Sequence, residues 1–383
     1  MNAPTSTIGI LGGGQLALML AEAAATLNVR VRVLVGHPSD ALPGLAARAI
    51  VGDANDPASA VAFAKTVDIV TLENEFIHPA ALAAIEHAGI PLRPTLASIQ
   101  RMQDKWHQKQ AIMKAGLPVT PCAVVNDAAG VIAFANDHGW PVVLKRRHLG
   151  YDGKGNATVH SPEDLETAWA TLHNDRGLYV EAFCPFEREL AVMVSRSVQG
   201  EVAVYPTVET VQKNHICHVV RAPAPVDEAL ARKAGDLAKA AIQSIGGIGS
   251  MGVELFLRAG QLLINELAPR VHNSGHYTIE ACRCSQFENH LRAIAGWPLG
   301  QTTMTSPSAV MINLLGAGDG PGVPSGLDTA KQVAGAHLHI YGKSRSVRGR
   351  KMGHVTALGN NLHEAEQIAR KAADALQFGN PAG

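Results

Sequence analysis

Two glutamates, Glu254 and Glu266, lie in neighbouring stretches that are typical of β-strands. The stretches 252–257 and 261–266 flank Ala259-Gly260 and together predict a hairpin. In that hairpin the two carboxylates become cross-strand neighbours, where like charges repel and burial among apolar residues is costly. A divalent cation removes both problems, because Mg²⁺ takes one or two carboxylates together with nucleotide phosphates. We therefore predict that Glu254 and Glu266 hold magnesium. Two exposed acids are the alternative, which the apolar neighbours of Glu266 disfavour.

A lysine at the end of a predicted strand, Lys145, comes shortly before a glycine-rich loop at 149–155. A lone lysine is most often a solvated charge. Here the loop is flexible because three of its seven residues are glycine, and its backbone N–H groups suit phosphate oxygens. The segment 180–184 follows at a predicted strand end, where Glu181 and backbone amides suit a nucleotide. Together these features indicate a nucleotide-phosphate site.

Near the N-terminus, residues 9–17 carry a G-x-G-x-x-A pattern between a predicted strand at 7–11 and a predicted helix at 15–27. This pattern is typical of dinucleotide-binding folds. Those folds need an acid at the end of the next strand, and here none occurs before Asp40, which disfavours a dehydrogenase. A second interpretation is that the glycines only allow a tight turn. We favour a third, in which backbone N–H groups at the helix start meet an anionic or polar substrate group.

Alternating strands and helices over 1–99 predict a parallel α/β domain. A second region at 100–298 combines strands at 178–183 and 189–194 with an amphipathic helix at about 227–245 and the hairpin described above. A third region at 299–383 opens with a Pro/Thr/Ser-rich linker and ends with a helix near 362–376. The fold class expected is therefore mixed, α/β followed by α+β.

The composition of the 383 residues is that of an ordinary globular protein, with 46% hydrophobic and 17% charged residues. Lys+Arg and Asp+Glu both number 33, so no net charge favours nucleic acid or an anionic membrane. Five scattered cysteines indicate a reducing, cytoplasmic compartment, and we interpret the Cys282/Cys284 pair as structural rather than as a metal site. We expect no membrane-spanning helix, and no signal peptide because Met1 to Thr7 lacks basic residues.

The order of lysine strand, glycine loop, acidic clamp and two metal-binding acids resembles the ATP-grasp superfamily. Longer strings carry a closer resemblance: IGILGGGQL at 8–16, KRR at 145–147 with GYDGKG at 150–155, NELAPRVHNSGH at 265–276 and GRKMGH at 349–354. From about residue 7 to 356 the chain resembles the N5-carboxyaminoimidazole ribonucleotide synthetase family. That resemblance implies an ATP-grasp fold with an N-terminal pre-ATP-grasp domain and a small C-terminal domain. It also implies carboxylation of 5-aminoimidazole ribonucleotide by bicarbonate and MgATP through carboxyphosphate.

The resemblance further implies roles for individual residues. ATP contacts would fall on Arg101, Lys145, Gly150, Tyr151, Asp152, Gly153, Lys154, Gly155, Glu181, Ala182, Phe183, Cys184, Glu189, Gln212, Asn265 and Glu266. The ribonucleotide would meet Gln15, Leu16, Glu73 or Glu75, Asp152, Arg350 and Lys351. The chemistry of bicarbonate and its phosphorylated form would involve Tyr151, Asp152, Arg270, His272 and Asn273, and Mg²⁺ would lie on Glu254 and Glu266.

One position departs from the family, since many relatives carry a histidine where this chain has Gln212. Either Gln212 replaces that contact or the nearby His215 takes it over. The nearest rival is the formate-dependent glycinamide ribonucleotide transformylase, also an ATP-grasp enzyme, which the HNSGH run at 272–276 disfavours. A non-catalytic nucleotide-binding module is disfavoured by the two acids and the second-substrate residues. A homodimer is expected from the resemblance alone.

Overall fold

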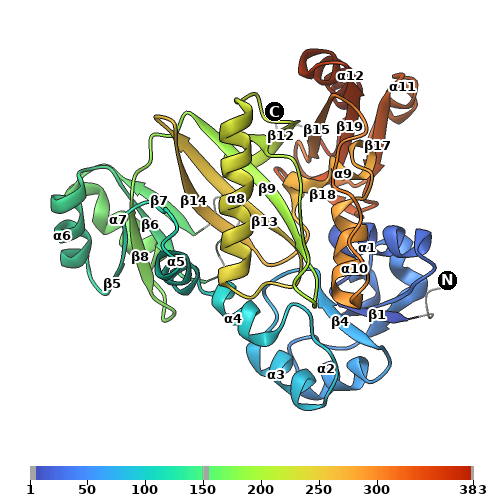
Figure 1. Ribbon diagram of the computed structural model, residues 1–383, viewed down its shortest axis with the longest axis horizontal. Helices are drawn as coiled ribbons and strands as arrows, with labels where there is room; N and C mark the ends of the chain where they lie inside the picture. Colours follow the sequence, from blue (N-terminus) through green and yellow to red (C-terminus); the bar gives the residue numbers. More distant parts are fainter. Residues whose placement is uncertain (1–5, 149, 151–154, 381–383) are drawn as a thin grey trace.

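The computed structural model describes residues 6–148, 150 and 155–380. Its N-terminal part is a parallel sheet in the strand order β3–β2–β1–β4, with helices packed against it (Figure 1). The elements are β1 (Thr7–Leu11), α1 (Gln15–Thr26), β2 (Arg30–Val35), β3 (Ala49–Val51), α2 (Pro57–Ala64), β4 (Ile69–Leu72) and α3 (Pro79–His87). The strand and helix predicted at 7–11 and 15–27 are confirmed, and the sheet is parallel as predicted.

Two short helices then lead into a small antiparallel sheet with the order β5–β8–β6–β7. The elements are α4 (Leu96–Gln103), α5 (Lys105–Lys114), β5 (Cys122–Val125), α6 (Ala128–His138), β6 (Val142–Arg146), β7 (Asn156–Val159), α7 (Pro162–Leu172) and β8 (Leu178–Ala182). Helices α6 and α7 share an apolar core with this sheet, so it forms a separate layered unit at one end of the molecule (Figure 1).

A larger antiparallel sheet forms the centre, in the order β14–β13–β9–β11–β12–β15–β19–β17, with β10 paired to β9. Its middle elements are β9 (Arg188–Arg196), β10 (Val202–Val204), β11 (Val208–Lys213), β12 (Ile216–Ala222), α8 (Glu228–Ser244), β13 (Gly249–Arg258), β14 (Gln261–Ala268), α9 (Thr278–Ala281) and α10 (Gln286–Ala295). Its C-terminal elements are β15 (Ser308–Leu315), β16 (Gly320–Pro321), α11 (Leu327–Lys331), β17 (Ala336–Ile340), β18 (Arg345–Ser346), β19 (Lys351–Gly359) and α12 (Leu362–Asp374).

The central sheet crosses the predicted boundary at residue 299, because β12 pairs directly with β15. Helix α8 covers β9 and β13, and α12 covers β15 and β19 (Figure 1). Helix α1 shares a buried core with α10, where Leu20 of the first and Phe287 of the second both belong to the same apolar cluster. The N-terminal sheet is therefore packed firmly against the central unit. The helices within the described ranges are all too short or too polar to cross a lipid bilayer.

Candidate active site

A cavity of about 870 Å³ lies where the small sheet, the central sheet and the N-terminal part meet. It brings together most of the residues that the sequence singled out. Those on its wall are Gln15, Leu16, Glu73, Glu75, Lys145, Gly150, Gly155, Glu181, Ala182, Phe183, Cys184, Glu189, Gln212, His215, Glu254, Asn265, Glu266, Arg270, His272, Asn273 and Lys351. The loop positions Tyr151, Asp152, Gly153 and Lys154 lie outside the described residues.

Two expected contacts, Arg101 and Arg350, are not on the cavity wall. The guanidinium group of Arg101 reaches the backbone oxygen of Ile245 at 3.4 Å. That of Arg350 donates to the backbone oxygen of Arg345 at 2.9 Å, and both arginines are exposed. Direct contact with a ligand in the cavity would need other side-chain positions, so both assignments stay predictions.

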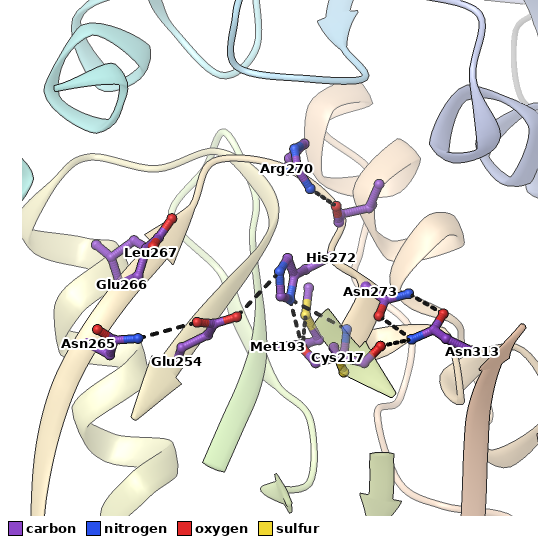
Figure 2. A network of polar contacts seen from close by, with 12 residues as sticks. Met193, Cys217, Glu254, Asn265, Glu266, Leu267, Arg270, His272, Asn273 and Asn313 are labelled. Carbon is purple, nitrogen blue, oxygen red and sulfur yellow. Dashed lines mark hydrogen bonds and ion pairs between the residues drawn. The ribbon is translucent and has the colours of Figure 1, made fainter. Parts of the chain in front are cut away.

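The carboxylate pair forms as the hairpin predicts. Glu254 of β13 is the cross-strand partner of Glu266 of β14, and the turn at Ala259 and Gly260 has positive φ at both residues, as two-residue hairpins prefer. Figure 2 shows Glu254 between Asn265 and His272, whose nitrogens lie 3.5 and 3.6 Å from its two oxygens. Burial, then the charges of Glu266 and Glu189, raise the pKa of Glu254 to about 8.

These features test whether the pair fits a divalent cation. Two carboxyl groups stand on one cavity wall, and burial followed by the charges of Glu266 and Glu189 disfavours the ionised form of Glu254; a cation bound to the pair would offset that cost. Among the described residues no three His, Cys, Asp or Glu side chains converge on one point. Two carboxylates suffice for Mg²⁺, which keeps its other positions for water and phosphate oxygens. The two carboxylates therefore fit Mg²⁺, whereas a metal that takes all its ligands from protein side chains would need more of them.

Lys145 does not stand alone on its strand. Its Nζ lies 2.8 Å from Glu181 Oε2, and the buried Lys109 of α5 reaches Glu181 Oε1 at 3.0 Å. Burial favours the neutral form of Glu181, but the two ammonium groups lower its pKa to about 2. The Glu181 carboxylate is thus already paired with the two lysines. A nucleotide bound at 181–184 would therefore form hydrogen bonds mainly with backbone groups of this segment.

Sequence reasoning missed Lys105 and Lys109, both on the cavity wall. Lys105 forms an ion pair with Glu266. The two lysines stand four residues apart at the start of a helix capped by Asp104, whose carboxylate accepts the backbone N–H of Trp106 at 2.9 Å. That spacing places both on one helical face, and it is the signal that could have revealed them.

The loop after β14, residues 269–273, is held by side-chain contacts of Arg270 and of Asn273. Arg270 Nε lies 2.6 Å from Glu75 Oε2, which ties the loop to the segment that follows β4. Burial opposes ionisation of Glu75, but Arg270 lowers its pKa overall. Asn273 and Asn313 exchange amide hydrogen bonds of 2.9 and 2.6 Å, and Asn313 also donates to the backbone oxygen of Cys217 at 2.9 Å (Figure 2).

His272 projects from this loop toward Glu254 and is neutral. Burial, followed by the charges of Arg270 and Lys351, lowers its pKa to about 3. Its Nδ1 lies 2.9 Å from Ser274 Oγ, which leaves Nε2 facing the carboxylate pair. His272 therefore supplies a hydrogen bond to the cavity and adds no positive charge there.

At the start of α1 the structure shows a contact that the sequence does not predict, while a substrate contact of Gln15 or Leu16 stays a prediction. The backbone N–H of Gly14 donates to the carboxylate of Glu73, so a group of the chain itself meets this helix N-terminus. A methyl group added at Gly14 would lie 2.2 Å from Glu73 Oε1. The glycine is therefore needed for the close approach of Glu73. Burial raises the pKa of Glu73, and the Gly14 N–H and Arg270 oppose that rise.

Two smaller sequence-based interpretations can be placed as well. Gln212 and His215 both line the cavity, and Gln212 bonds to Glu189, so the question of which contacts the nucleotide stays open. Cys282 and Cys284 are buried free thiols, and burial raises the pKa of each to about 12. Both thiols stay protonated at neutral pH, which agrees with a structural role.

Three family models match successive parts of the chain. Residues 5–103 match the ribonucleotide synthetase preATP-grasp domain, residues 110–287 the ATP-grasp domain, and residues 309–368 the phosphoribosylaminoimidazole carboxylase C-terminal domain. The chain is therefore an ATP-grasp protein.

Individual relatives indicate which family of ATP-grasp proteins the chain belongs to. The N5-carboxyaminoimidazole ribonucleotide synthase of Synechococcus elongatus is 40% identical over 92% of this chain and 89% of its own length. The crystal structure of the Thermotoga maritima N5-carboxyaminoimidazole ribonucleotide synthetase has a TM-score of 0.88 at 35% identity, covering 98% of this chain and 99% of that one. The chain belongs to the N5-carboxyaminoimidazole ribonucleotide synthase family.

Of two further relatives, one was solved with bound ligands and the other is longer than this chain. The Aspergillus clavatus N5-carboxyaminoimidazole synthase, solved with ADP and 5-aminoimidazole ribonucleotide, has a TM-score of 0.87 at 34% identity, covering 97% of this chain and 98% of that chain. The phosphoribosylaminoimidazole carboxylase of Schizosaccharomyces pombe is 42% identical over 94% of this chain. This chain spans 66% of the length of that fungal protein.

Proposed function

We propose that the protein carboxylates 5-aminoimidazole ribonucleotide with bicarbonate and ATP, yielding N5-carboxyaminoimidazole ribonucleotide, ADP and phosphate in purine (IMP) biosynthesis. The observation that carries this proposal is the cavity whose wall is shared by the paired acids, Lys145, the Arg270–Asn273 loop and the Glu73 segment. The family membership of the chain and the ligands of the Aspergillus clavatus relative support it.

The reaction divides into two steps. A bicarbonate oxygen attacks the γ-phosphorus of ATP, the bond to the β-phosphate oxygen breaks, and ADP leaves. The resulting carboxyphosphate loses its C–O bond to phosphate, the substrate amine forms the new N–C bond, and the amine proton passes to phosphate. Phosphoryl transfer depends mainly on positioning and charge neutralisation.

Several side chains of the chain suit the first step. Glu181 and Lys145 form a buried ion pair that holds the ammonium charge at a fixed place on the wall. Arg270, held by Glu75, presents a second fixed cation. Preorganised charges of this kind stabilise a transition state without rearranging during the reaction. Neutral His272 can donate or accept a hydrogen bond where bicarbonate would lie.

Glu254 and Glu266 are proposed to hold magnesium, which when bound neutralises part of the phosphate charge. Their cross-strand register and the raised pKa of Glu254 support that assignment. Asn265 stands beside Glu266 and its amide nitrogen lies 3.5 Å from Glu254, so it can orient that carboxylate. A cytoplasmic location and a homodimer are also proposed, the first from the free cysteines of the described chain and the second from the family resemblance.

The decisive experiment measures ADP release by the purified protein with two substrate pairs. We expect turnover with 5-aminoimidazole ribonucleotide plus bicarbonate and none with glycinamide ribonucleotide plus formate. Product identity can be followed with ¹³C-bicarbonate, which should label the carbamate carbon. Turnover with the glycinamide pair alone would overturn the proposal and favour the transformylase.

A further inference from the structure

The first residue of helix α5, Lys105, directs its ammonium group to one of the two proposed metal ligands. Its Nζ forms an ion pair with Glu266 Oε1, and the lysine side chain is 17% exposed. The partner Glu254 stands directly across the hairpin from Glu266. A positive charge of the chain itself thus lies at the carboxylate pair.

The backbone of Lys105 is held in place. Its N–H donates to the backbone oxygen of Arg147 at 2.8 Å. The preceding residue, Asp104, caps the helix, and Arg147 Nε lies 3.1 Å from each of its carboxylate oxygens. Only the side chain of Lys105 is therefore free to change its partner, and the lysine stem is long and flexible.

A divalent cation that takes Glu266 as a ligand must compete with this ammonium group. Two cations on one carboxylate stand within a few ångströms of each other, where like charges repel strongly in a partly buried site. We propose that Lys105 is an intramolecular counter-ion that weakens metal binding to Glu254 and Glu266 until a nucleotide draws it away. The inference rests on the magnesium assignment in the proposed function.

Nucleotide phosphates give Lys105 another anion, because the lysine lines the same cavity as Lys145 and the glycine positions Gly150 and Gly155. Once Lys105 pairs with phosphate, Glu266 becomes available to the metal. Metal and nucleotide then favour each other's binding, and this coupling is reciprocal. The arrangement limits free divalent cations from occupying the carboxylate pair on their own.

The test uses Mn²⁺ as the probe and measures free Mn²⁺ by electron paramagnetic resonance, with and without ADP. The variants are Lys105→Met, Lys105→Arg and Lys114→Met, the last an exposed lysine at the far end of the same helix. Without nucleotide, we expect Lys105→Met to bind Mn²⁺ about fivefold or more tightly than the wild type, the lower end of typical coupling between sites. Lys105→Arg and Lys114→Met should match the wild type.

With ADP present, the advantage of Lys105→Met should shrink or reverse. A second comparison places Lys105→Met in a Glu266→Gln background, where the gain should disappear because the two residues act through one ion pair. Thermal unfolding of each variant checks that the fold is intact. Unchanged Mn²⁺ affinity in Lys105→Met, or a gain that persists without Glu266, overturns the inference.

Failure here is distinct from failure of the proposed function. A wild type that turns over 5-aminoimidazole ribonucleotide, together with a Lys105→Met variant whose Mn²⁺ binding is unchanged, overturns the counter-ion role and leaves the proposed reaction intact. Lack of turnover with that ribonucleotide overturns the reaction whatever the metal titrations give.

Discussion

The carboxylate of Glu73 accepts a hydrogen bond from the backbone N–H of Gly14, so helix α1 begins against an anion that comes from the end of strand β4. This contact joins the two turns at which the family resemblance places the ribonucleotide. It also distinguishes Glu73 from Glu75, whose carboxylate is held by Arg270 of the central unit.

Gly14→Ala should separate Glu73 from the helix start. The added methyl group would lie 2.2 Å from Glu73 Oε1, which forces the carboxylate or the turn to shift. Overpacking of this kind typically costs about 1–3 kcal/mol. We expect a lower melting temperature and a raised KM for the ribonucleotide, measured by calorimetry and steady-state ADP release. Gly36→Ala is the control, since its methyl group would meet Asp40 at an ordinary 3.4 Å. Equal effects of both substitutions would contradict the role of this contact.

Glu266→Gln should nearly abolish turnover while the protein stays folded. The substitution removes one of the two charges proposed to hold magnesium, which weakens metal binding and the neutralisation of phosphate. The measurement is kcat over a Mg²⁺ titration that extends to saturation. Glu228→Gln, on the surface of α8 with its side chain 93% exposed, is the matched control. Near-normal kcat of Glu266→Gln at saturating Mg²⁺ would refute the metal assignment.

A buried histidine links three parts of the fold and makes stability depend on pH. The backbone N–H of Ser250 donates to His290 Nδ1 at 3.1 Å, so Nε2 carries the proton toward Thr71 Oγ1 at 2.9 Å. Burial lowers the pKa of His290 from 6.5 to about 4. The unfolded chain therefore binds this proton at a higher pH than the folded chain does. Stability contributed by neutral His290 is fully present above pH 6.5 and is lost as the pH falls toward 4.

The test of this dependence is urea unfolding between pH 4 and 8. We expect a loss attributable to His290 of no more than about 3 kcal/mol, since one pKa unit corresponds to 1.36 kcal/mol. His272, whose pKa is lowered to about 3, and His276 act in the same direction. His290→Gln should flatten part of the pH dependence, whereas substitution of the exposed His87 should not. An unchanged slope in His290→Gln would show that another group carries the effect.

Local patterns were sufficient to predict much of the fold. The hairpin of β13 and β14 is predicted from the two β-rich stretches that flank Ala259-Gly260, and Gly260 adopts the positive φ of such a turn without steric cost. The two-residue turn also fixes the register of Glu254 and Glu266. Helix α8 follows its amphipathic pattern, and its N-cap Asp227 accepts the N–H of Leu230 at 2.8 Å. The domain boundaries near 99 and 299 stay predictions. The central sheet continues across the boundary at 299, and local sequence patterns do not reveal this continuation.

What the sequence did not disclose depends on contacts between distant segments. The pairing of Val219 with Ile312 extends the central sheet, and neither strand's pattern specifies its neighbour. Lys109 looks like a surface lysine until its partner Glu181 is placed beside it. The longer motifs predict most of the candidate site residues, whereas charge partners such as Lys105 for Glu266 become visible only in the folded structure.

The final prediction concerns the basic segment 343–351 at the C-terminal side of the cavity. Lys351 begins β19 and lines the cavity, whereas the neighbouring Arg350 points to the backbone of Arg345. If the segment anchors the 5′-phosphate of the ribonucleotide, Lys351→Ala should raise the KM for that substrate about ten- to a hundredfold, the effect of losing a charge-assisted hydrogen bond.

Arg350→Ala should raise the same KM if its guanidinium group turns to the phosphate on binding, and a smaller effect than that of Lys351→Ala is expected from its position. The KM for ATP should change little in both variants, because the lysines proposed to face the nucleotide lie on β6 and α5. Lys331→Ala, an exposed cation on α11, is the control. Normal ribonucleotide KM in Lys351→Ala, or a selective loss of ATP affinity, would show that the phosphate anchor lies elsewhere.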